Sequence, residues 1–114
     1  MKNAPLGVGV DIIELKRFKS IRFLSRIAEL FLTKGEWREF SSHADPVAYV
    51  ASRFALKEAV IKAYPGKLTY RDFEIIKIGE KPHVNFLISP SAISRMFVSL
   101  SHSTDYVAGF AVAT

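Results

Sequence analysis

The first recognisable pattern of apolar positions in the chain is a short apolar run at residues 6–13. Valine and isoleucine dominate this run, and it is too short for a surface helix, so it predicts a buried strand. From Glu14 to about Phe31 the apolar residues recur at three- and four-residue spacing, which predicts a helix in one piece or two.

Two capping patterns predict where the next helices begin. Thr33 and Glu36 form a capping box, in which each side chain bonds to the backbone N–H of the other residue, so a short helix should follow to about residue 41. Asp45 is a typical N-cap and a proline follows it at the first helical position. The longest helix therefore spans about residues 46–64, before a Pro-Gly pair that ends it.

The second half of the chain has the shorter period of strands. Alternating apolar positions predict strands at residues 73–78, 83–88, 97–102 and 106–113. Residues 79–82 should form the turn between the first two, and Ser89-Pro90 predicts a short helix to about Met96. Without a regular βαβ alternation, we expect one small α+β domain over residues 1–114, with the long central helix packed on a largely antiparallel sheet.

Composition narrows the chemistry and the partners. The chain has 114 residues, a formal charge of +5, a pI of about 9.6 and no cysteine, which excludes disulfides, thiolate catalysis and Cys-ligated metal. We see neither a membrane-length apolar run nor a signal peptide, and we expect a cytoplasmic protein without membrane contact. A basic protein attracts anionic partners, which include nucleic acids, phosphorylated small molecules and acidic proteins.

Glu58 is the most informative single residue. On a wheel with about 100° per residue it lies in the apolar arc of the long helix, which holds Val47, Val50, Ala51, Phe54 and Ile61. A carboxylate in an apolar surrounding requires a cation, which can be a metal ion, an arginine or a lysine. A buried ion pair with Lys62, one turn further on, is the structural alternative to a metal site.

Asp11 poses the same question on the first strand. It interrupts an apolar run and points to the same side as Gly7 and Gly9, which allow another group to approach closely. The structural alternative is an Asp at a strand end that caps the next helix. Two carboxylates within apolar elements suit a hard cation such as Mg²⁺, which completes its shell with water and phosphate oxygens, so the pattern indicates phosphoryl chemistry.

Basic residues near Glu58 fit a bound pyrophosphate. Arg53, Lys57 and Lys62 all lie within about a turn and a half of it. The structural alternative is a solvated helix face for Arg53 and Lys57. His102, at a predicted strand end, can contact a phosphate or have only a structural role.

Four segments together resemble the holo-acyl-carrier-protein synthases, a family of phosphopantetheinyl transferases. They are Gly9-Val10-Asp11-Ile12 with Arg17, Arg53-Phe54-Ala55-Leu56-Lys57-Glu58-Ala59 with Lys62-Ala63, Gly79-Glu80-Lys81-Pro82, and Ser99-Leu100-Ser101-His102. The resemblance implies transfer of 4′-phosphopantetheine from coenzyme A to a serine of an apo acyl carrier protein, with Mg²⁺ as cofactor and a role in fatty acid biosynthesis.

The resemblance also implies roles for individual residues. Asp11 and Glu58 match the metal-binding carboxylates, and Lys62 matches a lysine beside the reacting pyrophosphate. Coenzyme A should contact Lys62 and four further residues, which are Arg53, Pro82, Ser101 and His102. Small members are trimers with active sites between subunits, so we expect a homotrimer.

The acidic carrier protein of this family gives the positive charge a use. We expect three arginines of the first helical stretch to steer and dock the carrier: Arg17, Arg22 and Arg26. The segment 64–68 after the central helix is shorter than the glycine-containing loop of the family, which leaves a catalytically idle member of the fold as one rival. A basic nucleic-acid-binding module is the other rival, although the chain shows no aromatic-basic stacking pattern.

Overall fold

The computed structural model describes residues 4–114, apart from the side chain of residue 21. The elements in chain order are β1 (Gly7–Glu14), the 3₁₀ turn η1 (Leu15–Phe18), α1 (Ile21–Phe31), α2 (Lys34–Ser42), α3 (Pro46–Ala63), β2 (Phe73–Ile78), β3 (Lys81–Phe86), β4 (Met96–His102) and β5 (Tyr106–Ala113). Within residues 4–114 no helix is both long enough and apolar enough to cross a membrane.

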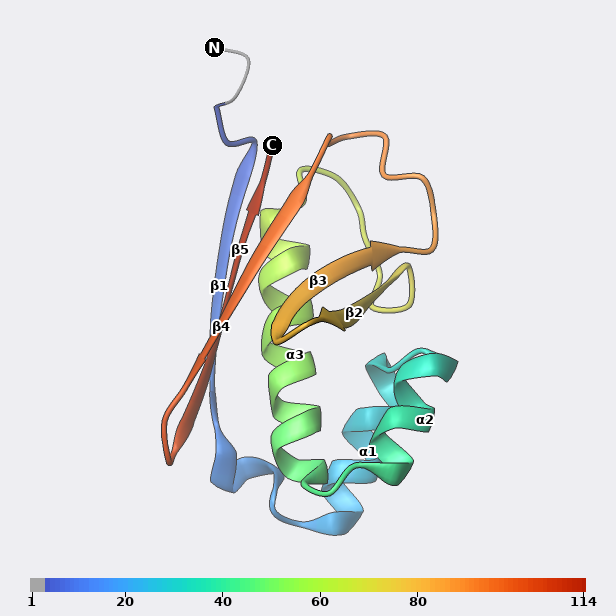
Figure 1. Cartoon of the computed structure of the whole chain (residues 1–114), viewed down its shortest axis with the longest axis vertical. Coiled ribbons are helices and arrows are strands. Elements are labelled where there is room, and N and C mark those ends of the chain that lie inside the picture. Colours follow the sequence, from blue (N-terminus) through green and yellow to red (C-terminus); the bar gives the residue numbers. More distant parts are fainter. Residues whose placement is uncertain (1–3) are drawn as a thin grey trace.

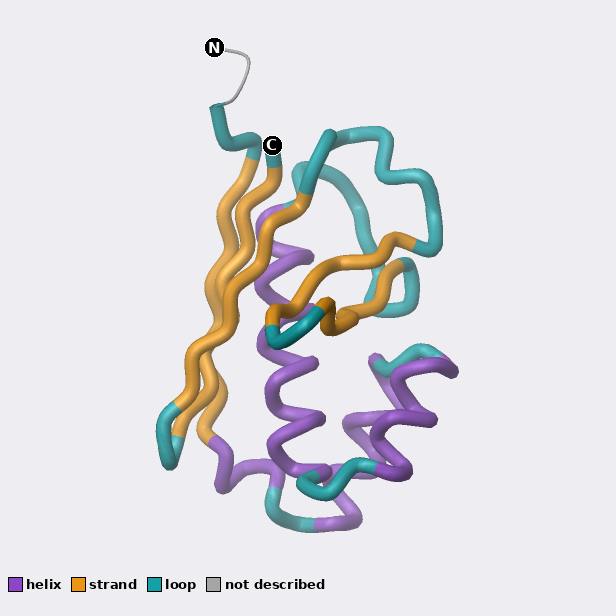
Figure 2. Tube along the Cα trace, in the orientation of Figure 1, coloured by secondary structure: helices purple, strands orange, loops and turns teal. Residues whose placement is uncertain are grey.

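The strands form two antiparallel sheets, which confirms the predicted α+β class. One sheet has the order β1-β5-β4 and the other is the hairpin of β2 and β3. The register of the larger sheet pairs Asp11 with Gly109 and His102 with Val107. Helix α3 lies along one face of the larger sheet, and the β2–β3 hairpin with α1 and α2 lies on the opposite side of α3 (Figure 1). The loops 64–72 and 87–95 lie on that same side (Figure 2).

Glycines allow α3 to lie directly on the larger sheet. A Cβ atom added to Gly9 would stand 1.9 Å from the carbonyl oxygen of Ala59, and one added to Gly109 would stand 2.7 Å from that of Ala55. Real Cβ atoms do not approach a backbone atom so closely, so only glycine fits at these strand positions. The predicted close approach is therefore the approach of α3 to the sheet.

The opposite face of the larger sheet, which we call the open sheet face, has no layer over it among the described residues. Even-numbered side chains of β1 point to it because strand side chains alternate between faces. Its large exposed apolar side chains are Leu6, Val8, Val10, Ile12, Phe97, Tyr106 and Phe110.

Helix α3 is buried on almost every side, which corrects two sequence-based interpretations. Arg53 is 5% exposed and Lys57 is 0% exposed, so they do not form a solvated helix face. Conversely, the arc around Glu58 is only partly buried, and Phe54 and Ile61 in it remain partly accessible. The reason is that α3 has a layer on both sides, so the wheel of one isolated helix does not show which side is deepest.

The predicted helix boundaries are confirmed at both capping patterns. Thr33 accepts a bond from the Glu36 N–H while the Glu36 side chain accepts from the Thr33 N–H, and Asp45 caps α3 through the Ala48 N–H. The expected helix over residues 14–31 consists of η1 and α1, and Glu14 is the last residue of β1.

Two predictions for the second half of the chain were wrong. Residues 90–96 form no helix: a single turn at residues 91–92 leads into β4, and the N–H groups of Ser94 and Arg95 bond to the carbonyl of Thr114, directly after β5, and not to carbonyls one helical turn back. The β2–β3 turn is centred on Gly79, which has φ of 65°, so Pro82 lies within β3 opposite Lys77 and not in the turn.

Candidate active site

Three of the predicted site residues meet where β1 passes α3. Asp11 extends from β1, while Glu58 and Lys62 lie one turn apart on α3. The Lys62 Nζ atom lies 3.0 Å from the Val10 carbonyl oxygen and 3.4 Å from Asp11 Oδ1. The hydroxyl of Tyr70 donates a short hydrogen bond to Oε1 of Glu58. We call Asp11, Glu58 and Lys62 the carboxylate cluster.

This geometry decides against both structural alternatives from the sequence. The cation that contacts Asp11 is Lys62, so Lys62 is not the ion-pair partner of Glu58 that the helix spacing allowed. Asp11 caps no helix either, because Glu14 is the residue that precedes η1.

The electrostatics of Asp11 indicate a carboxylate with incomplete compensation. Its Oδ2 atom is buried and has no hydrogen-bond partner. Burial raises the pKa of Asp11 most strongly, Lys62 opposes that shift, and the neighbouring Glu58 adds to it. The pKa of Tyr70 is raised to about 12, mainly by burial and then by Glu58, so its hydroxyl remains a donor at neutral pH.

The carboxylate cluster fits a hard divalent cation. A buried carboxylate oxygen without a donor gains from a cation, and the charge of Glu58 lies close enough to Asp11 to shift its pKa. Within residues 4–114 no three His, Cys, Asp or Glu side chains gather as a potential metal site. Two carboxylates are the number that Mg²⁺ usually takes from a protein, since water and substrate phosphate provide its other ligands.

A second group of predicted residues lines a cavity of about 520 Å³ at the other end of α3. Arg53 and His102 both line it, and we call it the arginine cavity. The Arg53 guanidinium lies 4.4 Å from the ring centre of Tyr49 and 4.0 Å from Oε1 of Glu39. The Arg53 Nε atom is buried and has no hydrogen-bond partner. An unpaired guanidinium donor with a histidine on the same wall suits a phosphate oxygen.

The carboxylate cluster and the arginine cavity are separate within one chain. Arg53 and Glu58 are five residues apart on α3 and therefore point about 140° apart around its axis. None of the three residues of the carboxylate cluster lines the arginine cavity. The predicted site residues consequently do not form one continuous site in a single protomer.

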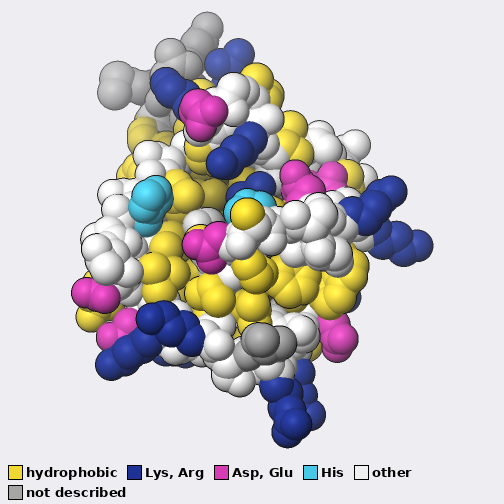
Figure 3. All heavy atoms as spheres, turned by 60° about the horizontal axis from the view of Figure 1, so that its bottom comes forward, with side chains coloured by type: hydrophobic (Ala, Val, Ile, Leu, Met, Phe, Trp, Pro, Cys, Tyr) yellow, Lys and Arg dark blue, Asp and Glu magenta, His cyan; other side chains and the backbone are white. Residues whose placement is uncertain are grey.

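The remaining predicted residues lie elsewhere. Pro82 lines a cavity of about 370 Å³ between β3 and β4, and exposed Ser101 shares the open sheet face with Phe97. The three arginines are exposed on η1 and α1: Arg17, Arg22 and Arg26. At the end of the molecule where these elements lie, Lys and Arg side chains project around apolar surface (Figure 3).

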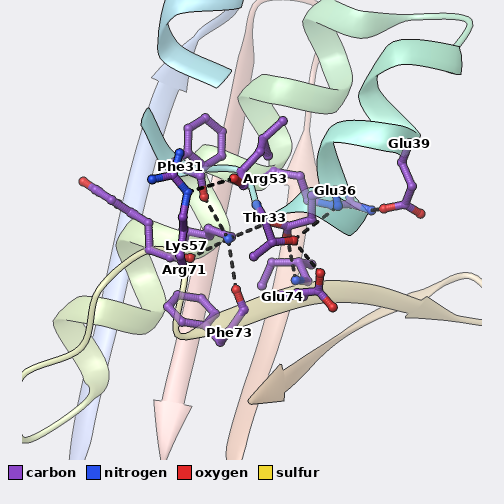
Figure 4. Close-up of polar contacts among 12 residues, drawn as sticks. Phe31, Thr33, Glu36, Glu39, Arg53, Lys57, Arg71, Phe73 and Glu74 are labelled. Carbon is purple, nitrogen blue, oxygen red and sulfur yellow. Dashed lines mark hydrogen bonds and ion pairs between the residues drawn. The ribbon is translucent and has the colours of Figure 1, made fainter. Parts of the chain in front are cut away.

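The sequence did not reveal a buried ion pair behind the site. Lys57 Nζ lies 2.6 Å from Oε1 of Glu36 and donates to the carbonyls of Phe31, Tyr70 and Phe73 (Figure 4). Burial lowers the pKa of Lys57, and the carboxylate of Glu36 opposes this shift. The pair joins α3 to α2 and to the start of β2. Its two partners are 21 positions apart, so no local pattern indicates it.

Tyr70 was also missed. It lies in the loop between α3 and β2, where neither helical nor strand periodicity applies. Its residue type gave no signal either, because the same loop also contains Tyr64 and Leu68.

Comparison with known proteins gives one consistent result. A family model of the 4′-phosphopantetheinyl transferase superfamily matches residues 7–112. The holo-[acyl-carrier-protein] synthase of Thermodesulfovibrio yellowstonii is 37% identical in an alignment that covers 95% of this chain and 97% of that protein. The corresponding protein of Serratia proteamaculans is 33% identical over 90% of this chain and 92% of its own length.

Solved structures agree with the sequence comparison. The holo-[acyl-carrier-protein] synthase of Neisseria meningitidis superposes with a TM-score of 0.83 and 32% identity, over 97% of this chain and 99% of that one. The Bacillus anthracis structure, a complex with CoA (3′,5′-ADP), gives a TM-score of 0.81 with 28% identity and covers 96% of both chains. The Helicobacter pylori structure, a complex with coenzyme A, gives 0.78 with 26% identity, over 94% of this chain and 99% of that one. The chain therefore belongs to the 4′-phosphopantetheinyl transferase superfamily and, within it, to the enzymes of the holo-[acyl-carrier-protein] synthase family.

Proposed function

We propose that this protein transfers 4′-phosphopantetheine from coenzyme A to a serine of an apo acyl carrier protein, with Mg²⁺ bound by Asp11 and Glu58. The observation that carries the proposal is the buried, unpartnered Oδ2 atom of Asp11, beside Glu58 and Lys62. Family membership supports the reaction, and the coenzyme A complexes of two structural relatives support the donor.

In this reaction the serine oxygen attacks the phosphorus that bears the pantetheine arm, and the bond to adenosine 3′,5′-bisphosphate breaks. Bound Mg²⁺ would neutralise charge on the pyrophosphate. Asp11 and Glu58 would hold the cation. The Lys62 ammonium, 51% exposed and with Asp11 Oδ1 3.4 Å away, would stabilise the departing phosphate from the side of β1.

The separation of the two groups of site residues supports an active site between protomers. We propose that the arginine cavity of one protomer holds the nucleotide end of coenzyme A while the carboxylate cluster of another holds the pyrophosphate. Buried Arg53 and neighbouring His102 provide donors for nucleotide phosphate oxygens. In this arrangement Ser101, on the open sheet face, would lie near the bound donor across the subunit boundary.

The open sheet face supports association into the homotrimer of the family. Val10 is 59% exposed and Ile12 is 65% exposed, and they continue a stripe of apolar side chains along β1. A contiguous apolar face of this kind marks an interaction surface. Light scattering should therefore show a trimer, and Ile12→Asp should give smaller species that no longer transfer; a wild-type monomer that transfers would contradict the assembly.

The exposed arginines of η1 and α1 support docking of an acidic carrier. Arg22 and Arg26 are one turn apart on α1, and Leu30, 68% exposed, continues the same row. A mixed basic and apolar surface suits an acidic helical partner, because charge steers the encounter and apolar contact holds the complex. We refer to Arg17, Arg22 and Arg26 as the docking arginines.

We place the reaction in the cytoplasm and in fatty acid biosynthesis.

The test is intact-mass spectrometry of an apo acyl carrier protein incubated with this protein, coenzyme A and Mg²⁺. The carrier should gain the mass of one phosphopantetheine arm, and EDTA or Glu58→Gln should abolish the gain. Glu29→Gln, exposed on α1 and outside both groups of site residues, is the matched control and should behave as the wild type. Coenzyme A binding without any mass gain across several carriers would instead identify an idle member of the fold.

A further inference from the structure

We propose that Tyr70 is a positioning residue, whose hydroxyl holds the Glu58 carboxylate in the orientation that binds the divalent cation. The inference rests on the proposed function, in which Glu58 is a metal ligand. None of the four family-like segments contains Tyr70, and it comes from the short loop after α3. The hydroxyl contacts Oε1 of Glu58 directly.

Tyr70 is itself held in place from several directions. Lys57 Nζ donates to its backbone carbonyl at 2.6 Å. Its ring centre lies 6.2 Å from that of Phe31 and 6.2 Å from that of Phe54. The Thr69 N–H bonds to Asp72 Oδ2 at 2.8 Å, which closes the turn around Tyr70. A side chain held in this way can fix the orientation of its partner.

The contact with Tyr70 also keeps Glu58 available for the divalent cation and away from Lys62. Glu58 and Lys62 have the i, i+4 spacing, with the acidic residue first, that favours an ion pair along a helix. In the structure Lys62 points to Asp11 and the Val10 carbonyl instead, and Glu58 points to Tyr70. Removal of the hydroxyl would leave Glu58 without this donor, so rotation toward Lys62 would compete with metal binding.

This arrangement gives the buried Lys57–Glu36 pair a role in the site. Lys57 directly precedes Glu58 on α3, and it anchors the carbonyl of the residue whose hydroxyl orients Glu58. The shortened loop therefore delivers an oriented hydroxyl to the metal site.

The experiment measures Mn²⁺ binding by electron paramagnetic resonance, with and without coenzyme A, on the full-length protein. Tyr70→Phe removes one hydroxyl and retains the packed ring. Because loss of a group that orients a metal ligand weakens affinity by about 10- to 100-fold, we expect the Mn²⁺ dissociation constant to rise by about 10-fold or more, with little change in melting temperature. Tyr64→Phe, at the C-terminal cap of α3, is the matched control and should bind Mn²⁺ as the wild type does.

The combination with Glu58→Gln separates positioning from general damage. Once Glu58→Gln has weakened Mn²⁺ binding, adding Tyr70→Phe should weaken it no further. An affinity of Tyr70→Phe within twofold of the wild type overturns the positioning role, and so does an equal effect in the Glu58→Gln background. A wild type that binds no Mn²⁺ under either condition overturns it too. Tyr70-dependent Mn²⁺ binding without transfer to any carrier would uphold the positioning role and refute the proposed function alone.

Discussion

Replacement of Lys57 by methionine is the most demanding test of how this fold is held together. The ammonium of Lys57 contacts Glu36 and three backbone carbonyls. Both side chains are buried: that of Lys57 is 0% exposed and that of Glu36 is 2% exposed. Methionine fills similar space but cannot donate. Lys57→Met would leave a buried carboxylate and three carbonyl oxygens without this donor.

The expected cost follows from that geometry. Removing one partner of a buried ion pair typically costs about 3–5 kcal/mol, because the other charge stays buried without compensation. Glu36 keeps its bonds from the Thr33 and Ile75 N–H groups, which argues for the lower half of this range. At about 4 °C per kcal/mol for a domain of this size, the melting temperature should fall by about 12–16 °C.

Lys62→Met on the same helix provides the matched control. Lys62 is 51% exposed and its ion pair with Asp11 is 3.4 Å long, so its loss should cost about 1 kcal/mol or less. Urea and thermal unfolding at one fixed protomer concentration measure both variants, because association changes apparent stability. Equal losses for Lys57→Met and Lys62→Met would refute the reasoning. The double variant Lys57→Met/Glu36→Gln should lose less free energy of unfolding than the two single variants lose together.

Three further outcomes are expected. Gly9→Ala should destabilise the protein by about 3 kcal/mol or prevent folding, because its Cβ would lie 1.9 Å from the Ala59 carbonyl oxygen. Gly66→Ala, where the nearest atom would lie 3.2 Å from the new Cβ, should be tolerated. Equal melting temperatures of the two variants would contradict the packing argument. Exchange of all three docking arginines for glutamate should raise the KM for the carrier and leave coenzyme A binding by calorimetry unchanged, and equal loss of both would exclude docking. Burial raises the pKa of Tyr49 above its usual value of 10.0. The contribution of Tyr49 to the free energy of unfolding is therefore complete below pH 10, the unfolded-state pKa, and is lost as the pH rises through the higher pKa of the folded state. The absorbance difference at 295 nm between wild type and Tyr49→Phe should therefore develop only well above pH 10, and its appearance near pH 10 in the folded protein would disprove the burial effect.

Local sequence patterns determined much of the fold. The capping box at Thr33 and Glu36 and the Asp45 cap depend on contacts within four residues, so they can be predicted from the chain alone. Strands β2 and β5 agree with their predicted ranges. Successive side chains of a strand point to opposite faces of the sheet, so the alternation of apolar and polar residues is visible in the sequence itself. The same local patterns identified Asp11, Glu58 and Lys62 as candidates.

Only the tertiary structure decided how those residues are partnered. Lys57 and Lys62 are both lysines of α3, yet one is fully buried on Glu36 and the other lies beside Asp11 at the surface. Layers on both sides of α3 produce this difference, and a helical wheel contains no information about a second layer. Tyr70 reaches Glu58 for the same reason, since the loop that carries it is placed by contacts with distant segments. The sequence thus determined which groups are available for chemistry, whereas long-range packing decided which of them meet.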